Sequence, residues 1–425
     1  YALGDAGAVD HIGETRAISN DLLWLRLAWQ KIGPQSEDLK VSALVYTADG
    51  RLVTQIDKLL LSNILQVPST EWKDGAQEET YFLIPIPPAT PPGMYRLALT
   101  IYGDESLARL PVAEAGPEGL LALTEFTVAP ATEPVSSDDL ALALPVQQEL
   151  LPGLTLVGFE TLPGDTVRSG AEVGASLIWQ AGETPLPVDL TMALVARAGE
   201  GDEEWPLSEP ADLAGAGYPT SRWQPGDLLR GWLTARIPPA FEPGLYRLRL
   251  RLTAAGSDAE PLVLPIGDFQ VEGWPRVFES PQPQFELEAD FAGQATLVGL
   301  DAEAAQVAPG ETLNARLYWR AETEFDREYT AFIHLIGPDG LLYGQVDQIP
   351  GGGTFPTTGW LPGEYIVDAY TVPVDPAAPP GEYVIEIGMY DPQTGQRLSV
   401  TGLHCQTEAC LETDDKVLLP GLKVQ

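Results

Sequence analysis

The chain consists of short runs in which hydrophobic and polar residues alternate. In the run EYVIEIGMYD, Tyr383, Ile385 and Ile387 belong to one face, and Glu386 and Gly388 belong to the other. A period of two residues is typical of a half-buried β-strand, and no segment carries a helical period with caps. The 42 glycines and 39 prolines are spread between such runs, as in turn-rich β-proteins. We therefore expect an all-β fold.

The same strand pattern occurs three times and is marked by tryptophans. In each copy a first tryptophan ends a strand, in LRLAWQ, ASLIWQ or ARLYWR, and a second follows VPSTE, YPTSR or FPTTG. A glycine and a tyrosine then lie 21 and 23 residues beyond the second tryptophan. These positions are Trp29, Trp72, Gly93 and Tyr95; Trp179, Trp223, Gly244 and Tyr246; and Trp319, Trp360, Gly381 and Tyr383. Identical offsets in three copies predict a triplicated module with a shared core.

Each copy is predicted to be an antiparallel β-sandwich of the immunoglobulin-like or fibronectin III-like type. Frequent turn signals between short strands indicate this architecture. The dipeptide Asp-Gly at Asp49 and at Asp339 predicts the same tight hairpin in the first and third copies. The sequence Pro-Gly-x-Tyr resembles a strand start with a corner tyrosine, whose hydroxyl bonds nearby backbone. The Cys…Trp…Cys framework of antibody domains is missing.

The repeat also predicts the domain boundaries. We expect module one at 1–130, a polar linker at 131–143, module two at 144–273, a Pro-rich linker at 274–284 and module three at 285–425. Modules two and three have a strand before their Leu-Val-Gly sequence that module one lacks, so module one is expected to be N-terminally incomplete. Prolines in the second linker favour an extended, semi-rigid connection.

The charge narrows the range of partners. With 24 basic and 61 acidic residues the formal net charge is −37, which disfavours nucleic acid and anionic membranes and favours cations or a basic partner. The acidic loops Gly199–Trp205 and Thr413–Lys416 are candidates for Ca²⁺ binding, although neither shows the spaced ligand array of calcium loops. A solvated loop is the simpler interpretation, and no cofactor is expected. No apolar run is long enough to span a membrane.

The only two cysteines, Cys405 and Cys410, lie close together in HCQTEAC. A disulfide that closes a local loop is the preferred interpretation, and a reduced pair without a role is the alternative. Two cysteines lack the four ligands of a structural zinc site. A disulfide would indicate an oxidising, extracellular or cell-surface location.

A search for catalytic constellations finds none, so we expect no enzyme and no catalytic or metal-binding residues. The sequence has no Gly-x-Ser-x-Gly, His-Glu-x-x-His or phosphate-loop pattern. The three histidines, His11, His334 and His404, are too far apart in the repeat to predict a cluster. Exposed tryptophans bind sugars by stacking, and Trp205 in its acidic hairpin is the candidate for a ligand contact. Packing in a core or interface is the alternative for that residue.

Module three resembles a known group of β-sandwich domains in the segments LVGLDAEAAQVAPGETLNARLYWRAE, YTAFIHLIGPDG, GGGTFPTTGWLPGEYIVDAY and PPGEYVIEIGMYDPQTGQRL. Such domains occur in surface proteins of Chloroflexota-type, often thermophilic, bacteria and after the membrane part of glycosyltransferase-like proteins. The likeness is moderate for module two and weak for module one. It implies an extracytoplasmic location and a binding or scaffolding role.

Two functions are therefore expected from the sequence. The first is a non-catalytic structural or interaction protein, whose partners are other protein chains of a larger surface assembly. The alternative is a carbohydrate-binding ectodomain of a membrane glycosyltransferase-like protein, with a glycan as ligand. The residues encoded before Tyr1 would separate the two, because a signal peptide favours the first and many hydrophobic spans favour the second.

Overall fold

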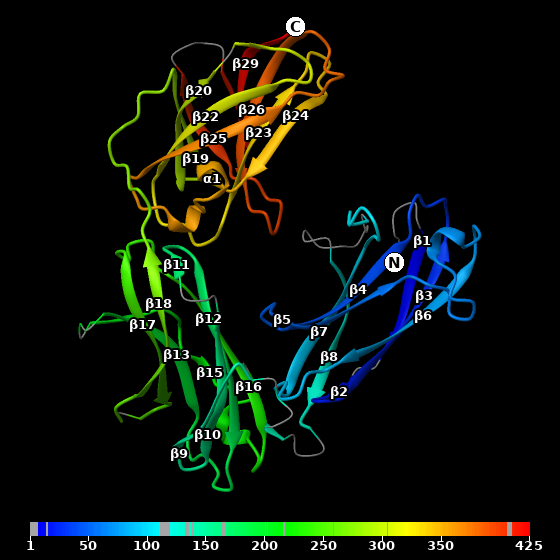
Figure 1. Ribbon diagram of the computed structural model, residues 1–425, viewed down its shortest axis with the longest axis vertical. Helices are drawn as coiled ribbons and strands as arrows, with labels where there is room; N and C mark the ends of the chain where they lie inside the picture. The colour runs from blue at the N-terminus through cyan, green and yellow to red at the C-terminus, as the bar shows by residue number, and fades with distance from the viewer. Residues whose placement is uncertain are drawn as a thin grey trace. The chain divides into compact units, whose positions relative to one another are not determined.

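The structure, a computed structural model, has an all-β fold of mainly antiparallel sheets (Figure 1). It describes residues 7–13, 16–110, 120–131, 136–137, 140, 142–162, 166–199, 201, 203–215, 217–257, 259–303, 305–405 and 410–425. Backbone contacts divide the chain into two compact units. The first comprises 1–162, 173–235 and 247–267, and the second comprises 163–172, 236–246 and 268–425. The module boundaries given above stay a prediction from the sequence.

Module one contains a three-stranded sheet, β1-β3-β6, and a five-stranded sheet, β2-β8-β7-β4-β5. Its elements are β1 (Gly7–Gly13), β2 (Arg16–Ile18), β3 (Leu22–Lys31), β4 (Leu39–Thr47), β5 (Leu52–Leu59), η2 (Ser69–Glu71), β6 (Gln77–Pro85), β7 (Gly93–Gly103) and β8 (Leu121–Ala129). Within the described part of the chain, β1 has no second neighbour, whereas the equivalent strands of the other modules have one.

Module two contains the sheets β16-β12-β10-β9 and β11-β18-β17-β13-β14, with β15 paired to β13. Its elements are β9 (Leu144–Leu151), β10 (Leu154–Leu162), β11 (Thr166–Arg168), β12 (Glu172–Ala181), β13 (Leu190–Ala198), β14 (Glu204–Pro206), β15 (Ala211–Asp212), η4 (Thr220–Arg222), β16 (Leu228–Arg236), β17 (Gly244–Ala254) and β18 (Leu262–Glu272).

Module three contains the sheets β25-β22-β20-β19-β27 and β21-β29-β26-β23-β24, with β28 paired to β29. Its elements are β19 (Phe285–Phe291), β20 (Ala295–Ala302), β21 (Gln306–Val307), β22 (Thr312–Ala321), β23 (Thr330–Ile336), β24 (Leu342–Gln348), α1 (Pro350–Gly353), η5 (Thr357–Gly359), β25 (Tyr365–Pro373), β26 (Gly381–Tyr390), β27 (Val400–Cys405), β28 (Leu411–Thr413) and β29 (Lys416–Val424).

The repeated tryptophans lie in the cores, as their fixed spacing predicts. All six are buried. The indole Nε1 of each second tryptophan donates to the carbonyl oxygen five residues earlier, at 2.8 Å for Trp72, 3.1 Å for Trp223 and 3.2 Å for Trp360. The Ser or Thr hydroxyl in the same loop accepts a bond from the backbone N–H that precedes or begins the facing strand in all three copies. These loops are therefore one recurrent anchor that connects the two sheets.

The corner tyrosine occurs in all three modules. Its hydroxyl donates to the carbonyl oxygen four residues earlier, at 2.7 Å for Tyr95, 3.1 Å for Tyr246 and 2.9 Å for Tyr383. Burial raises the pKa of each of these phenols, so they are neutral donors at physiological pH. The bond fixes the segment of chain that leads into β7, β17 or β26.

A buried carboxylate organises the glycine turn before η5. Asp368 on β25 is fully buried, and it accepts bonds from Gln348 Nε2 at 3.0 Å, the Gly352 N–H at 3.1 Å and the Tyr370 hydroxyl at 2.7 Å. Gly351 and Gly352 have φ of 72° and 67°, a left-handed conformation in which backbone N–H groups converge on an anion. Burial nevertheless outweighs these bonds and raises the pKa of Asp368 to about 6.

Replacing the corner tyrosine is expected to destabilise a module by the value of one buried hydrogen bond. Tyr95→Phe should lower the free energy of unfolding by about 1 kcal/mol, because the Pro91 carbonyl loses its donor. Tyr102→Phe on the same strand is the matched control, since that hydroxyl makes only an exposed 3.3 Å contact with Asp57. Urea denaturation measures both, and equal losses would contradict the assignment.

The raised pKa of Asp368 predicts a pH dependence of stability. A pKa above the ordinary value means that the protonated form favours the fold, so this contribution is complete below pH 4 and is lost as pH rises through about 6. The side chain of Asp368→Asn stays neutral. The free energy of unfolding of this variant should therefore rise relative to that of the wild type, by up to about 3 kcal/mol between pH 4 and pH 7.5. Thermal unfolding across this range measures the difference, and a pH-independent difference would contradict the prediction.

Candidate functional site

A tryptophan held by three neighbours begins the linker after β18. The rings of Trp274 and Phe355 stack with centroids 4.2 Å apart at an interplanar angle of 20°. The Arg168 guanidinium lies 4.2 Å from the Trp274 ring centroid. The indole Nε1 donates to the Ser169 carbonyl oxygen at 3.3 Å. Stacking and cation–π contact stabilise such a ring in one position, so they fix the first residues of the linker.

Arg276, two residues further on, joins segments that are far apart in sequence. Its Nη1 donates to the Gly359 carbonyl oxygen and to Glu364 Oε2, both at 2.7 Å. Its Nη2 donates to Ser169 Oγ at 3.1 Å and to the Pro239 carbonyl oxygen at 2.7 Å. The planar guanidinium can hold several acceptors at once, which a lysine ammonium cannot do in this geometry. We call Arg168–Gly170, Trp274, Arg276, Phe355 and Thr358–Glu364 the joint; all belong to the second compact unit.

The carboxylate of the joint is buried. Glu364 is fully buried, and its Oε2 accepts from Arg276 and from the Leu361 N–H at 2.9 Å. Its Oε1 has no hydrogen-bond partner among the described residues. Burial raises the pKa of Glu364, and the bonds from Leu361 and Arg276 act against that rise. The ion pair with Arg276 therefore stabilises the charged form of this buried carboxylate.

Two glycines allow the backbones of the joint to touch. A Cβ on Gly170 would lie 2.5 Å from the Cα and N of Gly359, and Gly170 has φ of +84°. The Thr358 hydroxyl donates to the Gly170 carbonyl oxygen at 3.0 Å. Both the space and the backbone conformation at Gly170 thus require glycine.

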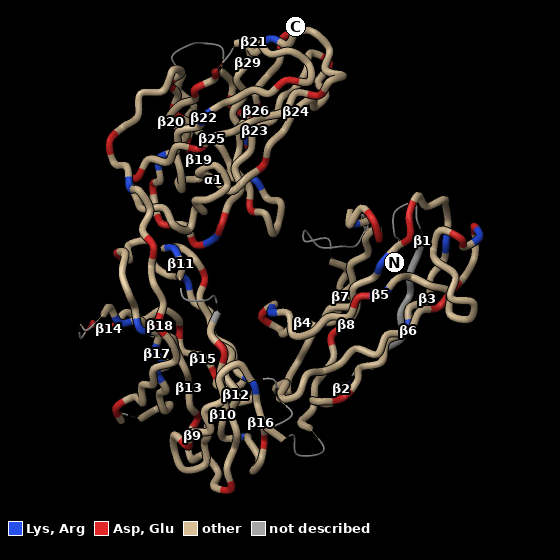
Figure 2. The backbone as a smooth tube through the Cα atoms, in the orientation of Figure 1, with Lys and Arg blue, Asp and Glu red and all other residues tan. Residues whose placement is uncertain are grey.

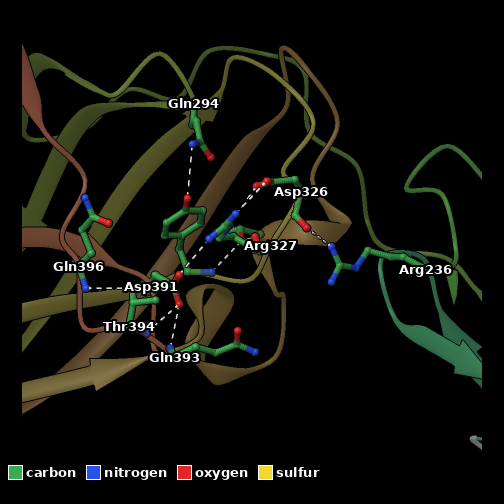
Figure 3. Close-up of polar contacts among 10 residues, drawn as sticks. Arg236, Gln294, Asp326, Arg327, Asp391, Gln393, Thr394 and Gln396 are labelled. Atoms are coloured by element: carbon green, nitrogen blue, oxygen red, sulfur yellow. Dashed lines mark hydrogen bonds and ion pairs between the residues drawn. The ribbon is translucent and has the colours of Figure 1, made fainter. Parts of the chain in front are cut away.

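A second arginine, Arg236, also contacts a residue far away along the chain (Figure 3). Arg236, the last residue of β16, donates from Nη1 to the Asp326 carbonyl oxygen at 2.5 Å. Arg327, the next residue, pairs with the carboxylates of Asp326 and Asp391, each at 3.3 Å. Asp391 also accepts the Gln393 N–H at 2.8 Å, so this loop of module three is held by a network of polar contacts.

The acidic hairpin with Trp205 is structured where it is described. Trp205 lies on β14 opposite Ala196 of β13 and is half-buried. The neighbouring Glu204 pairs with two arginines, Arg249 and Arg251, at 2.6 Å each. Residues 200 and 202 of this loop lie outside the described residues. A ligand contact at Trp205 stays a prediction.

The structure joins Cys405 and Cys410 in a disulfide with a Cα–Cα distance of 6.5 Å. Both cysteines are partly buried against the core of module three. The bridge ties the end of β27 to the residue before β28, and residues 406–409 between them lie outside the described part of the chain. The cross-link reduces the number of conformations that this loop can adopt in the unfolded chain.

The three histidines lie on separate strands. His11 is on β1, His334 on β23 and His404 on β27. His334 Nε2 contacts Asp347 Oδ1 at 2.9 Å. Among the described residues, no three His, Cys, Asp or Glu side chains are grouped so that they could hold a metal ion. In the same residues, no helix has the length and apolarity needed to cross a membrane.

The sequence did not predict the joint as a site. It assigned 274–284, which includes Trp274 and Arg276, to a Pro-rich connection. Arg276 lies among prolines without a repeat partner, and its acceptors are 37 to 107 residues away along the chain. The only signal in the sequence was a tryptophan and an arginine that the repeat does not require.

Removing the arginine of the joint is expected to be strongly destabilising. Arg276→Met should lower the free energy of unfolding by about 3–5 kcal/mol, because it leaves the Glu364 carboxylate buried and unpaired. The double variant Arg276→Met/Glu364→Gln removes both charges and should recover most of this loss. Urea denaturation and the rate of proteolysis in the linker measure both variants. A loss below 1 kcal/mol in the single variant would contradict the assignment.

Comparisons with known proteins add little to this geometry. No family model and no curated protein matches the sequence. Among solved structures, one described as a marsupial T cell receptor matches with 11% identity over 97% of this chain and 99% of that chain, at a TM-score of 0.17. A likeness at this TM-score carries no argument, so the description of the fold rests on the sheets themselves.

Proposed function

We propose that this chain is a non-catalytic structural or interaction protein of an extracellular or cell-surface assembly. The joint is the observation that carries the proposal. Contacts between neighbouring domains usually allow motion. Here the linker instead begins with a stacked tryptophan and an arginine that binds four acceptors. A chain that transmits position or force from one module to the next needs such a connection.

The disulfide supports the location in this proposal. Bridges such as Cys405–Cys410 form and persist in oxidising compartments outside the cytosol. The resemblance of module three to domains of bacterial surface proteins agrees with this. A strand at the edge of a sheet can offer backbone groups through which another chain adds a strand.

Cross-linking on intact cells of the source organism tests the proposal. A membrane-impermeant amine cross-linker, followed by immunoprecipitation, should recover this chain in covalent complexes with other surface proteins. Protease added to intact cells should degrade it. A chain protected from protease, or recovered without partners, would contradict the proposal. Binding on a glycan array without protein partners would instead favour the carbohydrate-binding alternative.

A further inference from the structure

Strand β17 of module two carries a ladder of three arginines on its outer face. Arg247, Arg249 and Arg251 alternate with buried residues of the core. A strand places residues i and i+2 about 6.5–7 Å apart on one face. Arg247 is exposed, and the side chains of Arg249 and Arg251 are 23% and 34% exposed. Lys and Arg positions are marked along β17 in Figure 2.

This arginine face has a net positive charge on a strongly acidic chain. Glu204 is shared by Arg249 and Arg251, at 2.6 Å from each. The three arginines outnumber the two nearby carboxylates, Glu204 and the exposed Asp268 of the neighbouring strand β18. The Nε of Arg251 is buried and has no hydrogen-bond partner among the described residues. The net charge of −37 makes two copies of the chain repel each other, so a contact between copies depends on a local group of basic side chains such as this face.

The fold itself does not require the arginine face. The repeat aligns its three positions with Arg96, Ala98 and Thr100 in module one and with Val384, Glu386 and Gly388 in module three. Those strands form the same sheet position without the ladder. The arginines therefore serve something particular to module two.

Strand β19 of module three carries the complementary pattern. Glu286 and Glu288 are exposed and Asp290 is half-buried on its outer face, while Leu287 and Ala289 are buried. Asp290 also accepts the Gly293 N–H at 2.9 Å. The acids alternate with buried residues as the arginines of β17 do, and the register of β19 shifts between Glu286 and Ala289. An acidic face and an arginine face can therefore meet charge against charge.

We propose that the arginine face of β17 binds the acidic face of β19 in a second copy of this chain. The inference rests on the proposed function and names the partner. The two faces differ, so a bound pair still presents one unused face of each kind, and the contact can propagate into rings or filaments. Ion pairs near the surface are individually weak and screened by salt, so the contact gains strength from repetition along an array.

Charge exchange tests the proposal with the full chain. Sedimentation velocity at 100 mM NaCl, where the repulsion between the acidic chains is screened beyond about 10 Å, and at 500 mM NaCl, over a hundredfold range of protein concentration, reports self-association. At low salt, self-association of the wild type should increase with protein concentration. At high salt the wild type should be monomeric. Arg247→Glu/Arg249→Glu and Glu286→Arg/Glu288→Arg should each weaken association at least tenfold. An equimolar mixture of the two variants should restore it, because each supplies the face that the other lacks.

Controls separate a failure of this contact from a failure to fold or of the proposed function. Arg96→Glu changes the equivalent exposed position of module one and should leave association unchanged. Thermal unfolding confirms that each variant folds. A wild type that is monomeric at every concentration, or variants that fail to restore association when mixed, would overturn the inference. If cross-linking on cells still recovers other surface proteins, the proposed function stands without it. Wild-type binding to a sulfated polysaccharide with no self-association would also overturn it.

Discussion

A carboxylate that is removed from water must be paired or neutralised, and Glu364 is in this position in the second compact unit. Its partner is an arginine from the linker, not from its own sheet. The same guanidinium reaches the carbonyls of Gly359 and Pro239. Several loops are therefore tied to one side chain, and a movement that separated Arg276 from Glu364 would leave a buried charge unpaired. The stacked tryptophan adds contact area to this electrostatic constraint.

The features that the three modules share have a different role from the features in which they differ. The shared residues, such as the second tryptophan with its carbonyl acceptor and the corner tyrosine, hold the two sheets of each module in register. They are needed for the fold in every copy. The arginine face and the disulfide occur in one copy only, and the joint combines residues of modules two and three with the linker. These features are the ones that can give the chain a task beyond folding.

The sequence predicted the repeated features well because they depend on local spacing. Period-two alternation predicted the strands, and the Pro-Gly-x-Tyr sequence predicted a hydroxyl bond to nearby backbone, which the structure shows to be the carbonyl four residues earlier. The site could not be predicted in this way. The acidic hairpin suggested a solvated loop, yet Glu204 pairs with arginines 45 and 47 residues away. Such pairings depend on which strands become neighbours, and period and composition do not contain that information.

A distance measurement across the joint tests the stiffness of the connection most directly. Glu242→Cys and Leu341→Cys are exposed positions within the second unit. The native cysteines are bridged, so spin labels would attach to the introduced ones. Pulsed electron paramagnetic resonance should give one narrow distance distribution, which broadens in the Arg276→Met/Glu364→Gln background. An equally broad distribution in both backgrounds would contradict the account.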